Sequence, residues 1–187
     1  MKKTLLTTAM TLLLATGFIL PVTIGTAQAQ RYAASEGYIT FYSEATVEDI
    51  EAKNEKIQSI FDTESGKIAY IVPIREFMFD KNLMRKHFNE NYMHTEKYPE
   101  ATFTGTLEGF TWKEGTQEVT AKGKLTIHGI TKEVEHTGTV TIEGNKMSMH
   151  AEFPVVLEEY EVERPKLLWK NIAEEVLVTV HLNYAKQ

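Results

Sequence analysis

Cysteine is absent from this chain of 187 residues. Without a thiol, the protein can form no disulfide framework and no Cys-ligated zinc or iron–sulfur site, and it cannot use a thiol in catalysis. A lipid anchor attached through cysteine is excluded for the same reason. The folded chain must therefore be stabilised by its own packing.

The sequence also lacks an excess of basic residues. It contains 20 Lys and Arg against 26 Asp and Glu, a net charge of −6 with neutral histidine. Nucleic-acid-binding proteins usually carry a basic face, so we expect no nucleic-acid partner. With 42% hydrophobic and 25% charged residues, the composition is that of a packed chain rather than a disordered one.

Residues 1–29 have the form of a signal peptide. Two lysines near the start precede an apolar stretch, which ends at Ala27-Gln28-Ala29, a small-x-small sequence typical of signal peptidase sites. We predict cleavage after Ala29 and a mature single domain over residues 30–187, in which 18 basic and 26 acidic residues give a net charge of −8. The mature protein is then periplasmic or secreted. An uncleaved anchor is the alternative, although Thr, Gly and Pro interrupt the apolar stretch.

No later segment approaches the roughly 20 apolar residues of a membrane-spanning helix, so we expect a mature protein that does not span the membrane. Most of it instead alternates between apolar and polar residues, the period of a β-strand. This alternation predicts strands at residues 38–47, 59–63, 67–77, 101–110, 119–127, 130–143 and 176–184. His128-Gly129 and Gly144-Asn145 read as hairpin turns. Glu159, Glu161 and Glu163 alternate with apolar neighbours and predict a solvated strand face.

One segment has a helical period instead. Asp80 is a candidate N-cap for a helix that runs to Glu90, and Pro99 marks the return to strand. One side of this helix consists of Leu83, Met84, His87 and Phe88. Several strands with one inserted short helix predict a mainly β fold, a closed or nearly closed antiparallel barrel of about eight strands.

Recognisable catalytic and cofactor motifs are absent. The chain has no Gly-x-Ser-x-Gly elbow, no His-Glu-x-x-His pattern and no Gly-rich phosphate loop. We predict that the protein is not an enzyme and needs neither metal nor cofactor, although a Ser/His/Asp triad assembled in space stays open. His87, Glu90 and His94 could hold a metal if the helix continued to His94. Exposed polar residues near a helix end are the simpler interpretation.

His136 is unusual because its parity places it with Val134 and Val140 on the apolar side of its strand. Three interpretations stay open for it: a core or rim histidine, a contact for the polar end of a ligand, or a catalytic group acting on a bound lipid. The many aromatic residues are equally ambiguous. A barrel of about eight strands can be packed solid or can hold one small ligand.

Three stretches of the chain carry a family resemblance. They are residues 87–93 with 97–103, the hairpin at 123–132, and the ending at 174–183. The hairpin is similar to a Gly-x-Leu-Thr-hydrophobic-His-Gly-hydrophobic-Thr motif. Together they resemble the YceI-like family of exported, lipocalin-like proteins. Two elements depart from the family pattern: Met84-Arg85-Lys86 stands where the family commonly has Arg-Asp, and residues 157–162 replace an Arg-x-Asp-Phe-Gly-like element.

The resemblance implies an elongated lipocalin-like barrel whose tunnel binds a long apolar molecule. We therefore expect an exported carrier that sequesters an isoprenoid or fatty-acyl chain, with a homodimer left open. The predicted ligand contacts are Phe41, Phe77, Phe79, His87, Phe88, Tyr92, Phe103, His128, Phe153 and Tyr160. The polar ones among them would lie near the mouth. The alternative is a solid-cored envelope or stress-related interaction protein without a lipid ligand.

Overall fold

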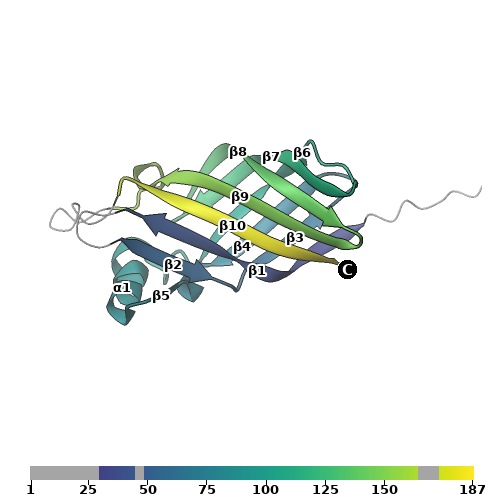
Figure 1. Cartoon of the computed structure of the whole chain (residues 1–187). Helices are drawn as coiled ribbons and strands as arrows, with labels where there is room; N and C mark the ends of the chain where they lie inside the picture. The colour runs from purple at the N-terminus through teal and green to yellow at the C-terminus, as the bar shows by residue number, and fades with distance from the viewer. Residues whose placement is uncertain (1–29, 45–48, 164–172) are drawn as a thin grey trace, which may run out of the picture.

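The computed structural model of the chain describes residues 30–44, 49–163 and 173–187, so the predicted signal peptide lies outside the described residues. The chain forms an antiparallel barrel with a short helical segment at one end (Figure 1). Its strands are β1 (Arg31–Ser43), β2 (Ile50–Asn54), β3 (Gln58–Asp62), β4 (Lys67–Pro73), β5 (Met78–Phe79), β6 (Glu100–Glu108), β7 (Gly115–Ile127), β8 (Ile130–Glu143), β9 (Lys146–Val156) and β10 (Glu175–Lys186). The helical elements are η1 (Ile74–Glu76), α1 (Asn82–His87), η2 (Phe88–Tyr92) and η3 (Leu157–Tyr160).

Eight strands close the barrel in the order β1-β3-β4-β6-β7-β8-β9-β10, and β10 pairs with β1 to complete the ring. The predicted fold class is thereby confirmed. β1 is long enough to have two neighbours along one edge. Its residues 31–33 pair with β3, while residues 39–43 pair with β2, which in turn pairs with β5. The strands β2 and β5 therefore extend the wall only at the end that carries α1.

The alternation places apolar residues inside the barrel as predicted. In β10, for example, Val176, Val180 and Leu182 are buried. The two predicted hairpin turns are also present, between β7 and β8 and between β8 and β9. His128 and Gly129 both have left-handed backbone angles, φ 52° and 80°, which a two-residue hairpin of this twist requires. Among the described residues, no helix has the length and apolar character needed to cross a membrane.

Most of the predicted strands differ from the structure in their bounds, and two of the differences have a clear local cause. β1 begins at Arg31 rather than residue 38, because a bulge between Ala34 and Glu36 shifts its register and interrupts the alternation. The far end predicted for this strand, residue 47, lies outside the described residues. β4 ends at Pro73 rather than residue 77. The buried Ile74 and Phe77 lie three residues apart, which is the period of the 3₁₀ turn that follows.

Two local predictions are wrong. The residue capping α1 is Lys81, without a side-chain hydrogen bond, and not Asp80. Residues 157–163 are not a strand but η3 followed by Glu161 in a left-handed conformation, φ 53°. The Val162 N–H donates to the Leu157 carbonyl and closes this turn. The acidic side chains are exposed as expected, because a tight turn also alternates its residues between solvent and core.

The interior of the barrel differs between its two ends. The end away from α1, where the C-terminus lies in Figure 1, is filled with fully buried side chains. Phe61, Ile142, Met147 and Leu182 are there at most 1% exposed, and the ring of Phe61 meets that of Phe110 edge-on at 5.0 Å. The end that carries α1 is hollow, and the candidate site lies there.

Candidate functional site

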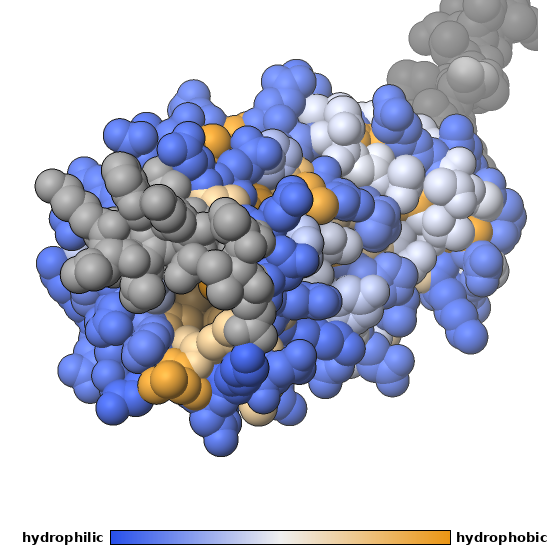
Figure 2. All heavy atoms as spheres, turned by 60° about the vertical axis from the view of Figure 1, so that its left-hand side comes forward, coloured by the Kyte–Doolittle hydropathy of each residue, from blue (hydrophilic) through white to orange (hydrophobic). Residues whose placement is uncertain are grey.

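The barrel encloses an apolar cavity of about 410 Å³, within the range of small-molecule sites. Figure 2 shows it as a hollow with an apolar floor at the end that carries α1. Side chains from strands all around the barrel line it, including Ile39, Val72, Leu125, Val155 and Val178. No Lys, Arg, Asp or Glu is among the described residues of this lining. The described lining therefore offers no permanently charged side chain to compensate an ionised ligand group.

Four phenylalanines form one wall of the mouth. Phe41 comes from β1, Phe79 from β5, Phe88 from η2, and Phe77 from the turn between η1 and β5. The ring of Phe88 lies 5.4 Å from Phe41, 5.8 Å from Phe77 and 5.0 Å from Phe79, all between centroids. These separations are those of favourable aromatic pairs. Three of the four lie within residues 77–88, so the stretch between β4 and β6 supplies most of an aromatic rim.

A hydrogen-bonded layer lies at the deep end of the cavity. The Tyr184 hydroxyl lies 2.6 Å from the Ser59 Oγ and donates to the Tyr70 hydroxyl at 3.2 Å. Tyr70 in turn directs its hydroxyl at the Met149 sulfur, 3.9 Å away. Burial raises the pKa of Tyr70 and of Tyr184, so both phenols stay neutral. This layer separates the cavity from the filled end of the barrel.

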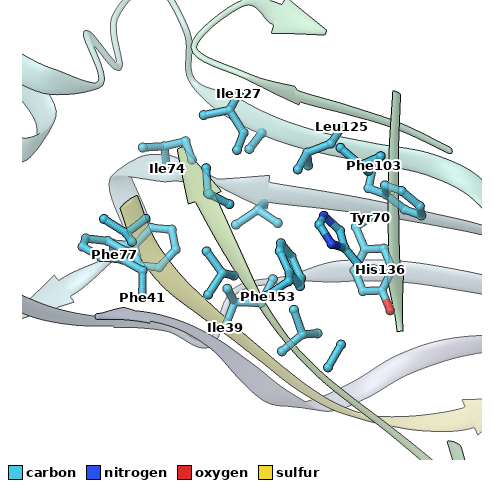
Figure 3. A pocket seen from close by; sticks show the side chains of 18 of the residues that line it. Ile39, Phe41, Tyr70, Ile74, Phe77, Phe103, Leu125, Ile127, His136 and Phe153 are labelled. Atoms are coloured by element: carbon cyan, nitrogen blue, oxygen red, sulfur yellow. The ribbon is translucent and has the colours of Figure 1, made fainter. Parts of the chain in front are cut away.

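His136 projects into the cavity from β8, beside Phe153 (Figure 3). The two rings stack with centroids 4.1 Å apart and planes 14° from parallel. Burial lowers the pKa of His136 and favours the neutral imidazole. Among the described residues, neither of its ring nitrogens has a hydrogen-bond partner. The inward orientation of the ring fits a core histidine, a ligand contact or a catalytic group, and it does not fit a histidine at the rim of the barrel.

Nine of the ten predicted ligand contacts line the cavity: Phe41, Phe77, Phe79, His87, Phe88, Tyr92, Phe103, Phe153 and Tyr160. His128 does not line it. Its Nε2 lies 2.9 Å from His94 Nδ1, its Nδ1 lies 3.2 Å from the Tyr160 carbonyl, and Tyr98 packs against its ring. His128 therefore ties the β7–β8 turn to the segments around the mouth.

The histidines near the helix do not form the arrangement that a metal would need. Helical structure ends at Tyr92, and His94 has a left-handed backbone, φ 44°, and contacts His128 instead of His87. The described residues contain no group of three or more His, Asp or Glu side chains placed to hold a metal ion.

The sequence-based selection missed several lining residues. Tyr70 and His136 line the cavity but are not among the ten predicted ligand contacts, and those ten include no aliphatic residue. Their signal was their even spacing on one face of a strand, as in Ile68, Tyr70 and Val72. Parity identifies inward residues, but it does not separate those beside a cavity from those in a filled core.

Comparisons with known proteins agree with this geometry. Residues 29–184 match the family model of the YceI-like domain. A polyisoprenoid binding domain from Saccharophagus degradans, implicated in plant cell wall breakdown, has a similar structure, with a TM-score of 0.72, 15% identity, and 83% of this chain and 98% of that chain covered. BcnA of Burkholderia cenocepacia has a TM-score of 0.68 at 19% identity, with 79% of this chain and 95% of that chain covered. A YceI protein of Campylobacter jejuni has a TM-score of 0.62 at 14% identity, with 77% of this chain and 88% of that chain covered. These identities show a shared fold alone. No curated protein matches the chain.

Proposed function

Because the chain belongs to the family of YceI-like domains, we propose that it is an exported binding protein that sequesters a long apolar molecule, an isoprenoid or a fatty-acyl chain, in its barrel. The observation that carries this proposal is the cavity itself. It has a volume of about 410 Å³, it opens at the aromatic rim, and no charged side chain is found among its described lining residues. The relative from Saccharophagus degradans, described as a polyisoprenoid binding domain, supports the same class of ligand.

The energetics of the cavity favour such an occupant. Each methylene group moved from water into an apolar site contributes about 0.8 kcal/mol. Unfilled space beside apolar side chains forfeits dispersion contacts that an apolar chain would restore. A long, flexible hydrocarbon can therefore bind usefully without any ionic interaction, and the polar groups near the mouth, His87, Tyr92 and Tyr160, would adjust selectivity.

Export is supported by the sequence of residues 1–29. The basic start, the apolar stretch and the small-x-small ending favour a cleaved signal peptide, and the family match begins at residue 29. We propose a periplasmic or secreted protein on these grounds. Since the chain has no cysteine, it carries no lipid anchor of the lipoprotein type after cleavage.

Binding is favoured over catalysis by the surroundings of His136. A catalytic histidine needs an orienting or reacting partner within hydrogen-bond reach. Among the described residues, no carboxylate, hydroxyl or other group is hydrogen-bonded to the His136 ring, and the neighbouring ring is the apolar Phe153. The alternative of a solid-cored interaction protein does not fit the cavity.

Lipid extraction of the purified protein, followed by mass spectrometry, tests this proposal. We expect one class of isoprenoid or acyl lipid to co-purify in a stoichiometric amount. Ala121→Trp, which directs an indole from β7 into the cavity, should reduce the retained lipid at least tenfold. Glu118→Trp, on the outer face of the same strand, is the matched control and should retain it. Recovery of no lipid, together with no uptake of added isoprenoids by the wild type, would contradict the proposal.

A further inference from the structure

His136 is an unpaired polar side chain inside an apolar cavity. A neutral imidazole has one N–H donor and one nitrogen acceptor. Among the described residues neither atom has a hydrogen-bond partner, although the ring points into the cavity with Phe103, Leu125 and Phe153 around it (Figure 3). The ring is half-buried and lines the cavity, where a polar group can pair with water or with a ligand. A polar atom of the bound ligand can therefore reach it.

The position of His136 is fixed by the wall of the barrel. The β8–β9 ladder ends at Gly138 and Ala151, although β8 continues in its pairing with β7 and β9 in its pairing with β10. The next inward pair, His136 and Phe153, therefore meets through stacked rings where the two backbones part. Stacking at 4.1 Å places one face of the imidazole against Phe153 and so leaves the ring edge, which carries both nitrogens, free to form hydrogen bonds.

The depth of His136 sets the orientation of a ligand. It lies six positions beyond Ile130, which is beside the mouth, roughly 20 Å of strand at 3.3 Å per residue. Figure 3 shows His136 and Tyr70 on one side of the pocket and Phe41 and Phe77 on the other. The polar side chain of His136 thus lies inside the barrel, and the aromatic rim lies at the opening of the barrel.

The charge of the site selects the kind of polar group. No Lys or Arg is among the described lining residues, and burial lowers the pKa of His136, so that no fixed cation would meet a phosphate or a carboxylate. The other titratable side chains that line the cavity are His87, His150, Tyr70, Tyr92 and Tyr160. An ionised head group would be desolvated there without compensation.

We propose that His136 is the specificity-determining contact for an uncharged hydrogen-bonding head group, a hydroxyl or carbonyl, which enters the barrel first while the apolar tail extends toward the phenylalanines of the mouth. This inference rests on the proposed function and adds to it the chemical class and the orientation of the ligand. Prenyl phosphates and ionised fatty acids are excluded as preferred ligands, whereas prenyl alcohols and long-chain carbonyl compounds are included.

Three probes with one carbon skeleton test the inference: phytol, phytane and phytyl phosphate, delivered from cyclodextrin at pH 7.5 to protein stripped of lipid. We expect the wild type to bind phytol about fivefold more tightly than phytane, the effect of one added hydrogen bond. Phytyl phosphate should bind at least tenfold more weakly than phytol. In a protein labelled with ¹⁵N, phytol but not phytane should shift the ring nitrogen resonances of His136.

Two variants and one control assign the preference to His136. In His136→Phe, phytol and phytane should bind within twofold of each other, while phytane binds as in the wild type and so reports an intact cavity. His136→Gln keeps a donor and an acceptor and should retain part of the preference. His181→Gln, on the outer face of β10, is the control and should leave the preference for phytol over phytane unchanged.

The outcomes are separable. If no probe binds, the proposed function and this inference both fail. If all three bind but phytol has no advantage over phytane, or if His136→Phe keeps that advantage, the inference is overturned while the binding function stands. Tightest binding of phytyl phosphate would overturn it as well.

Discussion

His94 and His128 are joined ring to ring, with His94 Nδ1 2.9 Å from His128 Nε2. Since the Tyr160 carbonyl near His128 Nδ1 can only accept a hydrogen bond, His128 donates from Nδ1, which leaves Nε2 as the acceptor of the tautomer that carries one ring proton. The His94 Nδ1–H is then the donor between the rings. Tyr160 lines the cavity, so this chain of contacts links the β7–β8 turn to the wall of the mouth.

Replacing either histidine by asparagine should weaken this link without straining the backbone. Both residues have positive φ, which asparagine tolerates. We expect each of His94→Asn and His128→Asn to lower the free energy of unfolding by about 1 kcal/mol, measured by urea denaturation. The double variant should cost less than the sum of the two, because each single change already removes the shared bond. Strict additivity would show that the two rings are not coupled.

Phe88 should be the most sensitive residue of the aromatic rim. It touches Phe41, Phe77 and Phe79, so Phe88→Ala removes three ring contacts at once. We expect about 2 kcal/mol of destabilisation, below the range for a fully buried Phe because this ring is half-buried. Retained lipid should dissociate at least tenfold faster. Leu83→Ala, in the adjacent helix and 62% exposed, is the control and should leave both quantities nearly unchanged.

Burial of His136 should make the lipid-free protein less stable in mild acid. Its folded pKa lies below the ordinary value of 6.5, so between those two values the unfolded chain binds the additional proton. Stability contributed by the neutral ring is present above about pH 6.5 and is lost as the pH falls through the folded pKa. His136→Gln should flatten this part of the profile of unfolding free energy between pH 5 and 7.5. An unchanged slope would contradict the assignment.

The hydroxyl groups of Ser59 and Tyr184, at the floor of the cavity, should also contribute to stability as a coupled pair. Tyr184→Phe leaves the Ser59 Oγ without its partner and removes the donor to Tyr70. We expect a loss of about 1–2 kcal/mol, because a buried hydroxyl is left unsatisfied. Ser59→Ala in the Tyr184→Phe background should recover part of that loss, since both partners are then apolar. If the second change adds its own full cost instead, the hydroxyls do not act as a pair.

The sequence predicted the barrel well because alternation determines which side of a strand faces inward. Val176 and Leu182 share one parity and both lie inside the barrel. Yet Val176 borders the cavity and Leu182 belongs to the filled end, and nothing in the spacing distinguishes them. That difference depends on the combined volume of side chains from opposite strands, which a single-strand pattern does not contain. The His94–His128 contact was equally hidden, since it joins residues 34 positions apart.

One wall of the barrel depends on paired glycines, which yields the last prediction. Gly105 in β6 and Gly123 in β7 are directly opposite each other. A Cβ on Gly123 would lie 2.3 Å from the Thr104 carbonyl oxygen and 2.6 Å from the Gly105 Cα, closer than any real contact. Gly123→Ala should therefore force the two strands apart and destabilise the protein by at least about 2 kcal/mol.

The matched control for this substitution lies in the β8–β9 turn. Gly144→Asn places a residue that tolerates positive φ where nothing lies within 4 Å of the added Cβ. It should cost less than about 1 kcal/mol in the same urea denaturation measurement. Because Gly123 precedes the cavity-lining Leu125 on β7, strand separation should also reduce lipid retention in Gly123→Ala but not in Gly144→Asn. Equal stability of the two variants would show that the strands can accommodate a side chain at the glycine pair.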